Sequence, residues 1–171
     1  MWKYLTLLCG LLAASAHAST PDATLANIKS SNIISPLQQQ TAQDRRQALC
    51  LALAIYHEAR GENLDGQIAV GQVVLNRIDA SHQTICETVW RHGQFQWTRR
   101  PVSAQTPREL AAWRDVQYTA LVLLKTQPID YTQGATMFFN NKLCHPKWHG
   151  TVTARFGNHV FMRPAMASLY E

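Results

Sequence analysis

The sequence has no apolar run long enough to cross a bilayer. Its N-terminal run, residues 5–14, is about half the length of a membrane-spanning helix, so no stable membrane insertion is expected. Acidic residues are also scarce, since 11 Asp and Glu face 16 Lys and Arg in a chain of formal net charge +5. The basic residues are scattered, which argues against a nucleic-acid partner. The charge suits an anionic polymer, and equally a protein that is only kept soluble by it.

The first residues have the order of a secretory signal peptide. Lys3 gives a positive start to the apolar run, and Ala16-His17-Ala18 ends it with small residues. We therefore predict a signal peptide over residues 1–18 and a location outside the inner membrane, periplasmic or extracellular. Residues 19–42, rich in Ser, Pro and Gln, are predicted to be a polar, flexible leader. Residues 43–171 are then enough for one folded domain.

Few cysteines remain once the signal peptide is removed. They are Cys50, Cys86 and Cys144, and an oxidising compartment favours one bridge with one thiol left over. Cys50 stands inside an apolar run, where a small core residue is the simplest interpretation. The prediction is therefore a disulfide between Cys86 and Cys144.

Helical patterns fill the first two thirds of the predicted domain. Residues 43–60 are apolar nearly all round in the middle, which predicts a central buried helix, and residues 64–79 have a wide apolar face. A capping box at Thr84–Glu87 predicts a short helix. A second capping box at Thr106–Glu109 predicts a longer helix that reaches Lys125.

The pattern changes to strands near the C-terminus. Residues 135–139 are typical of a strand, and residues 151–156 and 159–162 are typical of a hairpin around a Gly157-Asn158 turn. Helices followed by a small antiparallel sheet predict an α+β domain.

Glu58 is the residue with the clearest chemical potential. It lies near the C-terminal end of the predicted central helix, where apolar surroundings raise the pKa of a carboxyl group. A carboxylic acid still protonated near neutral pH can donate the proton that a glycosidic bond needs in order to break. His57-Glu58 begins a zinc-peptidase motif, but Gly61 stands where the second His is required. Cys144-His145 and His149 have metal-binding residue types without a completing cluster, so we expect no metal and no cofactor.

An ordered set of motifs around Glu58 resembles the SleB-type, spore-cortex-lytic family of cell-wall hydrolases. The resemblance covers about residues 45–163. The matching pieces are Glu58-Ala-Arg-Gly-Glu62, Gly66-Gln-Ile-Ala-Val-Gly-Gln-Val-Val-Leu-Asn76-Arg77, Gln94-Phe95, Ala135-Thr136, and Trp148 before Gly157-Asn158-His159. One departure is Met137-Phe138-Phe139, where many relatives have His-Tyr-His.

The resemblance implies a catalytic domain over residues 43–171 with a lysozyme- or transglycosylase-like fold. It implies that the partner is peptidoglycan, cut between N-acetylmuramic acid and N-acetylglucosamine, with Glu58 as the catalytic acid. We also expect a monomer. The expected substrate-binding residues are Gln94, Phe95, Trp97, Thr136, Asn76 and Trp148. Core packing explains Phe95 equally well, and helix-end hydrogen bonding explains Asn76 equally well.

A second carboxylate is hard to find in the sequence. Glu62 is the possible one, although a structural role at the helix junction is its simpler interpretation. Glycoside hydrolysis usually needs two carboxylates, whereas a lytic transglycosylase forms 1,6-anhydro ends with a single acid and base. The sequence therefore favours a lytic transglycosylase that uses Glu58. The alternatives are a hydrolytic muramidase and a non-catalytic peptidoglycan-binding module.

Overall fold

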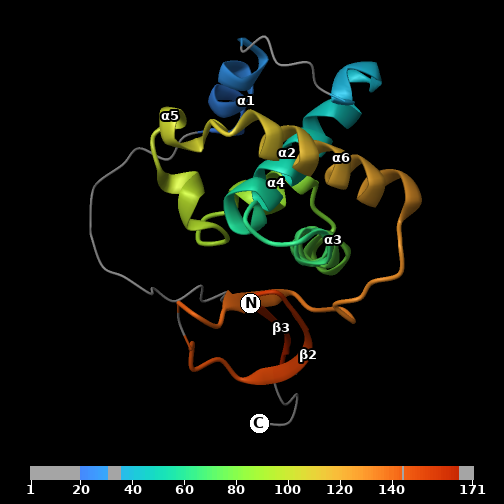
Figure 1. Ribbon diagram of the computed structural model, residues 1–171, viewed down its shortest axis with the longest axis vertical. Helices are drawn as coiled ribbons and strands as arrows, with labels where there is room; N and C mark the ends of the chain where they lie inside the picture. The colour runs from blue at the N-terminus through green and yellow to red at the C-terminus, as the bar shows by residue number, and fades with distance from the viewer. Residues whose placement is uncertain (1–19, 31–35, 144, 166–171) are drawn as a thin grey trace.

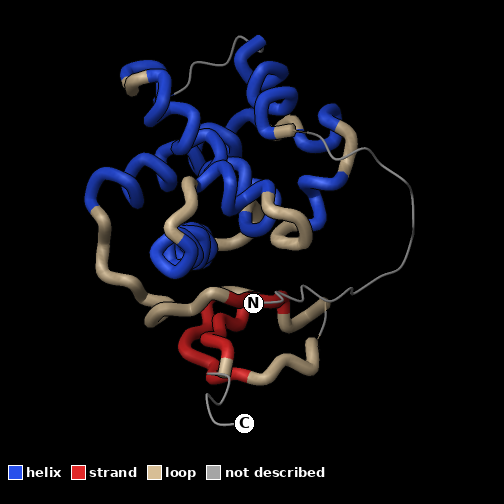
Figure 2. Tube along the Cα trace, turned by 180° about the vertical axis from the view of Figure 1, so that it is seen from behind, coloured by secondary structure: helices blue, strands red, loops and turns tan. Residues whose placement is uncertain are grey.

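The fold has a helical layer above a small sheet. The structure is a computed structural model that describes residues 20–30, 36–143 and 145–165. Its helices are α1 (Pro21–Ser30), η1 (Pro36–Gln39), α2 (Ala42–Ala59), α3 (Leu64–Ser81), α4 (Ile85–Trp90), η2 (Gln96–Arg99), α5 (Val102–Gln105) and α6 (Leu110–Thr126). Its strands are β1 (Met137–Asn140), β2 (Gly150–Phe156) and β3 (His159–Pro164). The sheet lies beneath α3 in Figure 1, and the same separation is visible from behind in Figure 2. The predicted α+β class is confirmed.

Helix α2 is the centre of the molecule. Thr41 starts it, because its hydroxyl accepts a hydrogen bond from the backbone N–H of Asp44 at 3.1 Å. Every side chain from residue 48 to residue 56 is buried, and α2 packs against α3, α4 and α6. The central buried helix predicted over residues 43–60 is confirmed.

The two predicted capping boxes have different outcomes. The Thr84–Glu87 box is present and starts α4. At residues 106–109 the prediction is wrong, because α6 begins at Leu110 and Glu109 makes no side-chain cap. The Glu109 carboxylate instead accepts hydrogen bonds from the Tyr56 hydroxyl at 3.0 Å and from Arg60 Nε at 2.6 Å. Partners on α2, distant in the sequence, thus replace the local cap.

The sheet is antiparallel in the order β1-β3-β2. Strands β2 and β3 are joined by the expected two-residue turn, in which Gly157 has a φ of +55°. Phe161 of β3 is fully buried against Ala69, Val70 and Val73 of α3. This second apolar cluster attaches the sheet to the helical layer.

Part of the segment predicted to be a flexible leader is folded. Residues 21–30 form α1, whose Leu25 and Ile28 belong to the main hydrophobic core. The Thr24 hydroxyl also donates to Gln105 Oε1 at 2.5 Å, which ties α1 to α5. The leader prediction is therefore wrong for residues 21–30, because the sparse apolar side chains share one face of a helix. The predicted signal peptide and its cleavage site lie outside the described residues.

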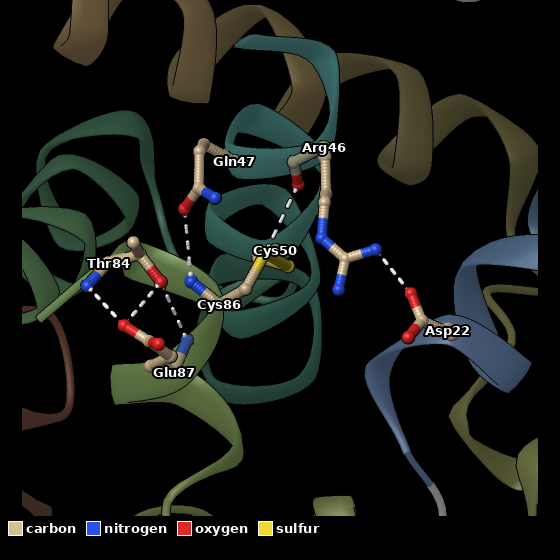
Figure 3. The surroundings of a disulfide bond; sticks show 7 residues. All are labelled: Asp22, Arg46, Gln47, Cys50, Thr84, Cys86 and Glu87. Carbon is tan, nitrogen blue, oxygen red and sulfur yellow. Dashed lines mark hydrogen bonds and ion pairs between the residues drawn. A yellow bond between two sulfur atoms is a disulfide. The ribbon is translucent and has the colours of Figure 1, made fainter. Parts of the chain in front are cut away.

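The predicted disulfide pairing is also wrong. Cys86 is bonded to Cys50, as Figure 3 shows, with the two Cα atoms 5.3 Å apart. Helix α4 packs directly on α2, so Cys86 reaches the fully buried Cys50. Gln47 Oε1 accepts the backbone N–H of Cys86 at 3.2 Å and supports this contact. Cys144, the partner expected from the sequence, lies outside the described residues.

Candidate functional site

Glu58 lies at the C-terminal end of α2 and lines a cleft of about 520 Å³. The cleft is formed entirely by the helical layer. Its lining comes from the end of α2, from η2, and from the segment that runs through α5 toward α6. The lining residues are Tyr56, His57, Glu58, Arg60, Gln96, Trp97, Arg100, Ala104, Thr106, Arg108 and Glu109.

The surroundings of Glu58 give its carboxyl group an unusually high pKa. Burial raises the pKa of Glu58 from 4.5 to about 7, because the charged form loses contact with water. The nearby guanidinium groups of Arg77 and Arg100 oppose this rise. Trp97 opposes it more weakly, and its indole Nε1 lies outside good hydrogen-bond geometry. Both protonation states of Glu58 are therefore accessible near neutral pH, as an acid that later acts as a base requires.

One wall of the cleft is a stacked pair of rings. Trp97 and His57 lie nearly parallel, with centroids 4.3 Å apart and planes at 20°. His57 Nε2 donates to the Gln105 carbonyl at 2.8 Å, and burial lowers the pKa of His57 below its usual 6.5. A neutral imidazole thus supports the Trp97 ring at the edge of the site. The structure places Trp97 beside Glu58, as the sequence predicted for a groove residue.

Gln94 and Phe95 do not line this cleft. Both are buried, and the Arg77 guanidinium lies over the Phe95 ring at 5.2 Å. Gln96 takes the exposed position in the cleft instead. The sequence prediction named the right segment but missed Gln96, because only the 3₁₀ turn of η2 decides which of its side chains face outward.

Asn76 and Thr136 do not line the cleft. Their hydrogen bonds hold together the structure around it. Asn76 Nδ2 donates to Asp130 Oδ2, Thr132 Oγ1 and the Ala135 carbonyl at 2.9, 3.1 and 3.0 Å. The carbonyl of Thr136 accepts from Arg77 Nε at 2.8 Å. These bonds fasten the segment before β1 to the end of α3. They thereby hold Arg77 in place near Glu58.

Trp148 belongs to a separate aromatic group on the sheet. It is half-buried and meets Phe139 edge-on, with ring centroids 6.0 Å apart. Phe138, within the unusual Met137-Phe138-Phe139 stretch, packs against His159 and Phe161. The structure does not bring Trp148 or Phe139 to the Glu58 cleft.

Glu62 is engaged by the turn between β2 and β3. Its Oε1 accepts from Asn158 Nδ2 at 2.9 Å, and its Oε2 accepts from the Asn158 backbone N–H at 3.2 Å. His159 Nδ1 lies 3.7 Å from Oε1, and the Glu62 side chain is 10% exposed. A Cβ added to Gly157 would overlap Oε2, so the turn fits closely around the carboxylate. Glu62 therefore joins the helical layer to the sheet.

We predict that Glu62→Ala lowers the free energy of unfolding by about 2–3 kcal/mol, because it removes a nearly buried, charged acceptor from two donors. Residual activity per folded molecule should stay within a few-fold of the wild type. Urea denaturation and a specific-activity assay measure the two effects. Asp65→Asn, which changes an exposed carboxylate in the first turn of α3, is the matched control. A loss of activity without a loss of stability in Glu62→Ala would instead indicate a catalytic Glu62.

The sequence prediction missed most of the cleft's charged lining. This lining comes from the residue that follows α2 and from the connection between η2 and α6: Arg60, Arg100, Arg108 and Glu109. Their only sequence signal was proximity to the quoted motifs, and Glu109 had been explained as a capping residue. Among residues 20–30, 36–143 and 145–165, no three His, Cys, Asp or Glu side chains gather as metal ligands.

A comparison with protein families places the chain in a known group. The family described as cell wall hydrolase matches residues 61–162, more than half of the chain. The chain belongs to the cell wall hydrolase family. The matched range begins just after the turn that carries Glu58. A comparison with curated proteins gave no match.

Solved structures agree with the assignment to the cell wall hydrolases. The catalytic domain of the germination-specific lytic transglycosylase SleB from Bacillus anthracis has 25% identity and a TM-score of 0.55, over 73% of this chain and 98% of that one. The SleB catalytic domain from Bacillus cereus has 23% identity and a TM-score of 0.52, over 78% of this chain and 99% of that one. This cell wall hydrolase is thus an enzyme with the predicted lysozyme- and transglycosylase-like fold. No helix in the described part of the chain is both long and apolar enough to span a membrane.

Proposed function

We propose that this enzyme cleaves the glycan strand of peptidoglycan between N-acetylmuramic acid and N-acetylglucosamine as a lytic transglycosylase. The observation that carries the proposal is the half-buried carboxyl group of Glu58 in the cleft, whose pKa of about 7 suits it to lose and regain a proton at neutral pH. The likeness to a domain described as a lytic transglycosylase supports the same reaction.

In the proposed reaction Glu58 acts twice. Its carboxylic acid first gives a proton to the bridging oxygen as the bond from that oxygen to C1 of the muramic acid breaks. The C6 hydroxyl of the same sugar then bonds to C1, and its proton passes to the Glu58 carboxylate. The products are a 1,6-anhydro end and a free hydroxyl, no water is consumed, and Glu58 recovers its starting state.

The arrangement of the other carboxylates favours this route over hydrolysis. Hydrolysis requires a second carboxylate that is available to a water molecule or to C1. Glu109 also lines the cleft, but it is held by Tyr56 and Arg60, and these contacts lower its pKa. Glu62 is occupied by Asn158. No further Asp or Glu in the described residues lines the cleft.

The proposal predicts the mass of the products released from purified peptidoglycan. Mass spectrometry of the soluble muropeptides should find anhydro ends, and Glu109→Gln should reduce the rate by less than about tenfold, since it removes a structural rather than a reacting group. Products heavier by one water, together with a loss of about a thousandfold in Glu109→Gln, would identify a hydrolytic muramidase. Cell-wall binding without any soluble product would identify a binding module.

Peptidoglycan lies outside the inner membrane, so the proposed function agrees with the predicted signal peptide and periplasmic or extracellular location. We also propose that the enzyme is a monomer, which is supported by a cleft whose lining comes from α2, η2 and the segment before α6 of one chain.

A further inference from the structure

We infer that the arginines of the Glu58 cleft bind a carboxylate of the muramyl unit, so that the enzyme selects glycan carrying free acid groups. The inference rests on the proposed function and adds to it the chemical class of the substrate. The sugar rings of peptidoglycan are uncharged, and its carboxylates lie on the stem peptide or, where the peptide is absent, on the lactyl group.

The cleft has an excess of positive charge. Three arginines, Arg60, Arg100 and Arg108, are among its lining residues. The carboxylates are Glu58, which is largely protonated below pH 7, and Glu109. Arg60 is committed to Glu109 at 2.6 Å and also lies over the Tyr56 ring at 5.0 Å. Arg60 and Glu109 therefore neutralise each other, and the other two cationic side chains of the lining are Arg100 and Arg108.

Arg108 is presented at the cleft by a fixed backbone. Its N–H donates to the Tyr56 hydroxyl at 3.1 Å, and the next N–H, that of Glu109, donates to the same oxygen at 3.2 Å. The residue is exposed, and no carboxylate in the described chain forms an ion pair with it. A guanidinium on an anchored backbone is suited to a two-pronged contact with a carboxylate.

Arg100 precedes α5 in the sequence, whereas Arg108 follows it. Its carbonyl accepts from Gln105 Nε2 at 2.6 Å, and Gln105 itself is fully buried. The positive field of Arg100 reaches both Glu58 and His57, where it lowers the pKa of each group. Arg100 also lines the same cleft as Glu58, so a glycan bound there lies beside both side chains.

A general excess of charge on the protein does not explain this distribution. Arg114 on α6, for example, is exposed, lies outside the cleft and has an acidic neighbour, Asp115, at 4.0 Å. Positive charge within a cleft also attracts an anionic substrate more strongly than the same charge on an open surface. The arginines beside Glu58 therefore have the position of a recognition site.

The test compares substrates that carry different carboxylates. Purified peptidoglycan is used untreated, or with its carboxylates converted to neutral methylamides, or stripped of stem peptides by an amidase so that the lactyl carboxylates remain. The wild-type kcat/KM for anhydro products should fall about tenfold on the methylamide form, since charge-assisted hydrogen bonds are lost. Retained activity on the stripped strands would show that the lactyl carboxylate can take the place of a stem-peptide carboxylate, and loss of activity would restrict recognition to the stem peptide.

The variants decide whether these arginines are responsible. The double variant Arg100→Gln/Arg108→Gln should lose about tenfold on untreated peptidoglycan and show no further loss on the methylamide form. Arg114→Gln, the matched control, should behave as the wild type on every substrate. Equal wild-type rates on untreated and methylamide peptidoglycan, or a double variant that loses the same factor on both, would overturn the inference. A wild type that releases no anhydro product from any substrate would overturn the proposed function instead.

Discussion

Glu58→Gln is expected to lower the rate of anhydro-product release by about a thousandfold or more, because the amide can neither give nor accept the proton. Glutamine has nearly the same shape, so the cleft and the stack of Trp97 on His57 should persist. The wild-type kcat/KM should also fall about tenfold per pH unit above the Glu58 pKa of about 7, since only the protonated form starts the reaction. The residual rate of the variant should lack this fall. Full activity in Glu58→Gln would show that another group is the acid.

The same substitution should make the folded protein more stable at high pH. The pKa of Glu58 is raised by folding from 4.5 to about 7, so the folded state binds more protons than the unfolded state between these values. Stability contributed by this group therefore decreases as pH rises through that interval, and the full cost above pH 7 is about 3 kcal/mol. Glu58→Gln should remove that cost at pH 8 and change little at pH 4.

A control with the opposite sign is available in α4. Hydrogen bonds from Thr84 lower the pKa of the exposed Glu87, so its charge stabilises the fold above its unfolded pKa and this contribution is lost as pH falls. Glu87→Gln should thus lower the melting temperature at pH 8 while Glu58→Gln raises it. Equal destabilisation by Glu58→Gln at pH 4 and pH 8 would mean that folding does not raise the Glu58 pKa.

The second large effect concerns stability. Replacing both Cys50 and Cys86 by Ala should lower the free energy of unfolding by about 4 kcal/mol, because the bridge closes a loop with a sequence separation of 36 residues. The melting temperature should fall by about 10 °C or more, measured by calorimetry or circular dichroism. Activity at low temperature should remain, since Cys50 lies about two helical turns before Glu58.

Cys144→Ser separates the two possible pairings. It should leave the melting temperature, and the decrease caused by a reductant, as they are in the wild type. Peptide mapping without reduction should recover a fragment that joins Cys50 to Cys86. A fragment that joins Cys86 to Cys144, or reductant insensitivity in Cys144→Ser, would support the pairing expected from the sequence instead.

The sequence was most informative where one segment determines its own structure. The apolar middle of α2, the Thr84–Glu87 box and the Gly157-Asn158 turn each follow from local chemistry, and all three are present. The raised pKa of Glu58 could be predicted for the same reason, since apolar neighbours lie on its own helix. The main failures, at Cys50 and at Glu109, concern partners that lie 36 and about 50 residues away in the sequence.

The cleft itself could not be derived from sequence spacing. A motif indicates which segments matter, but only packing decides which side chains face the same space. Gln94 and Gln96 illustrate this, because the first is buried and the second lines the cleft. Asn76 belongs to a family motif, and its side chain donates hydrogen bonds that hold the segment before β1 in place.

Tyr56 connects the helix that carries Glu58 to the segment on the other side of the cleft. Its ring lies in the turn of α2 that carries Glu58, and its hydroxyl binds the backbone of Arg108 and Glu109 as well as the Glu109 carboxylate. The rigid Tyr56 side chain therefore sets the spacing between Glu58 and the Arg108–Glu109 segment on the other side of the cleft. The width of the cleft is therefore determined by packing in the folded protein before any glycan binds. Any redesign of the rim for wider or narrower strands must begin at this tyrosine.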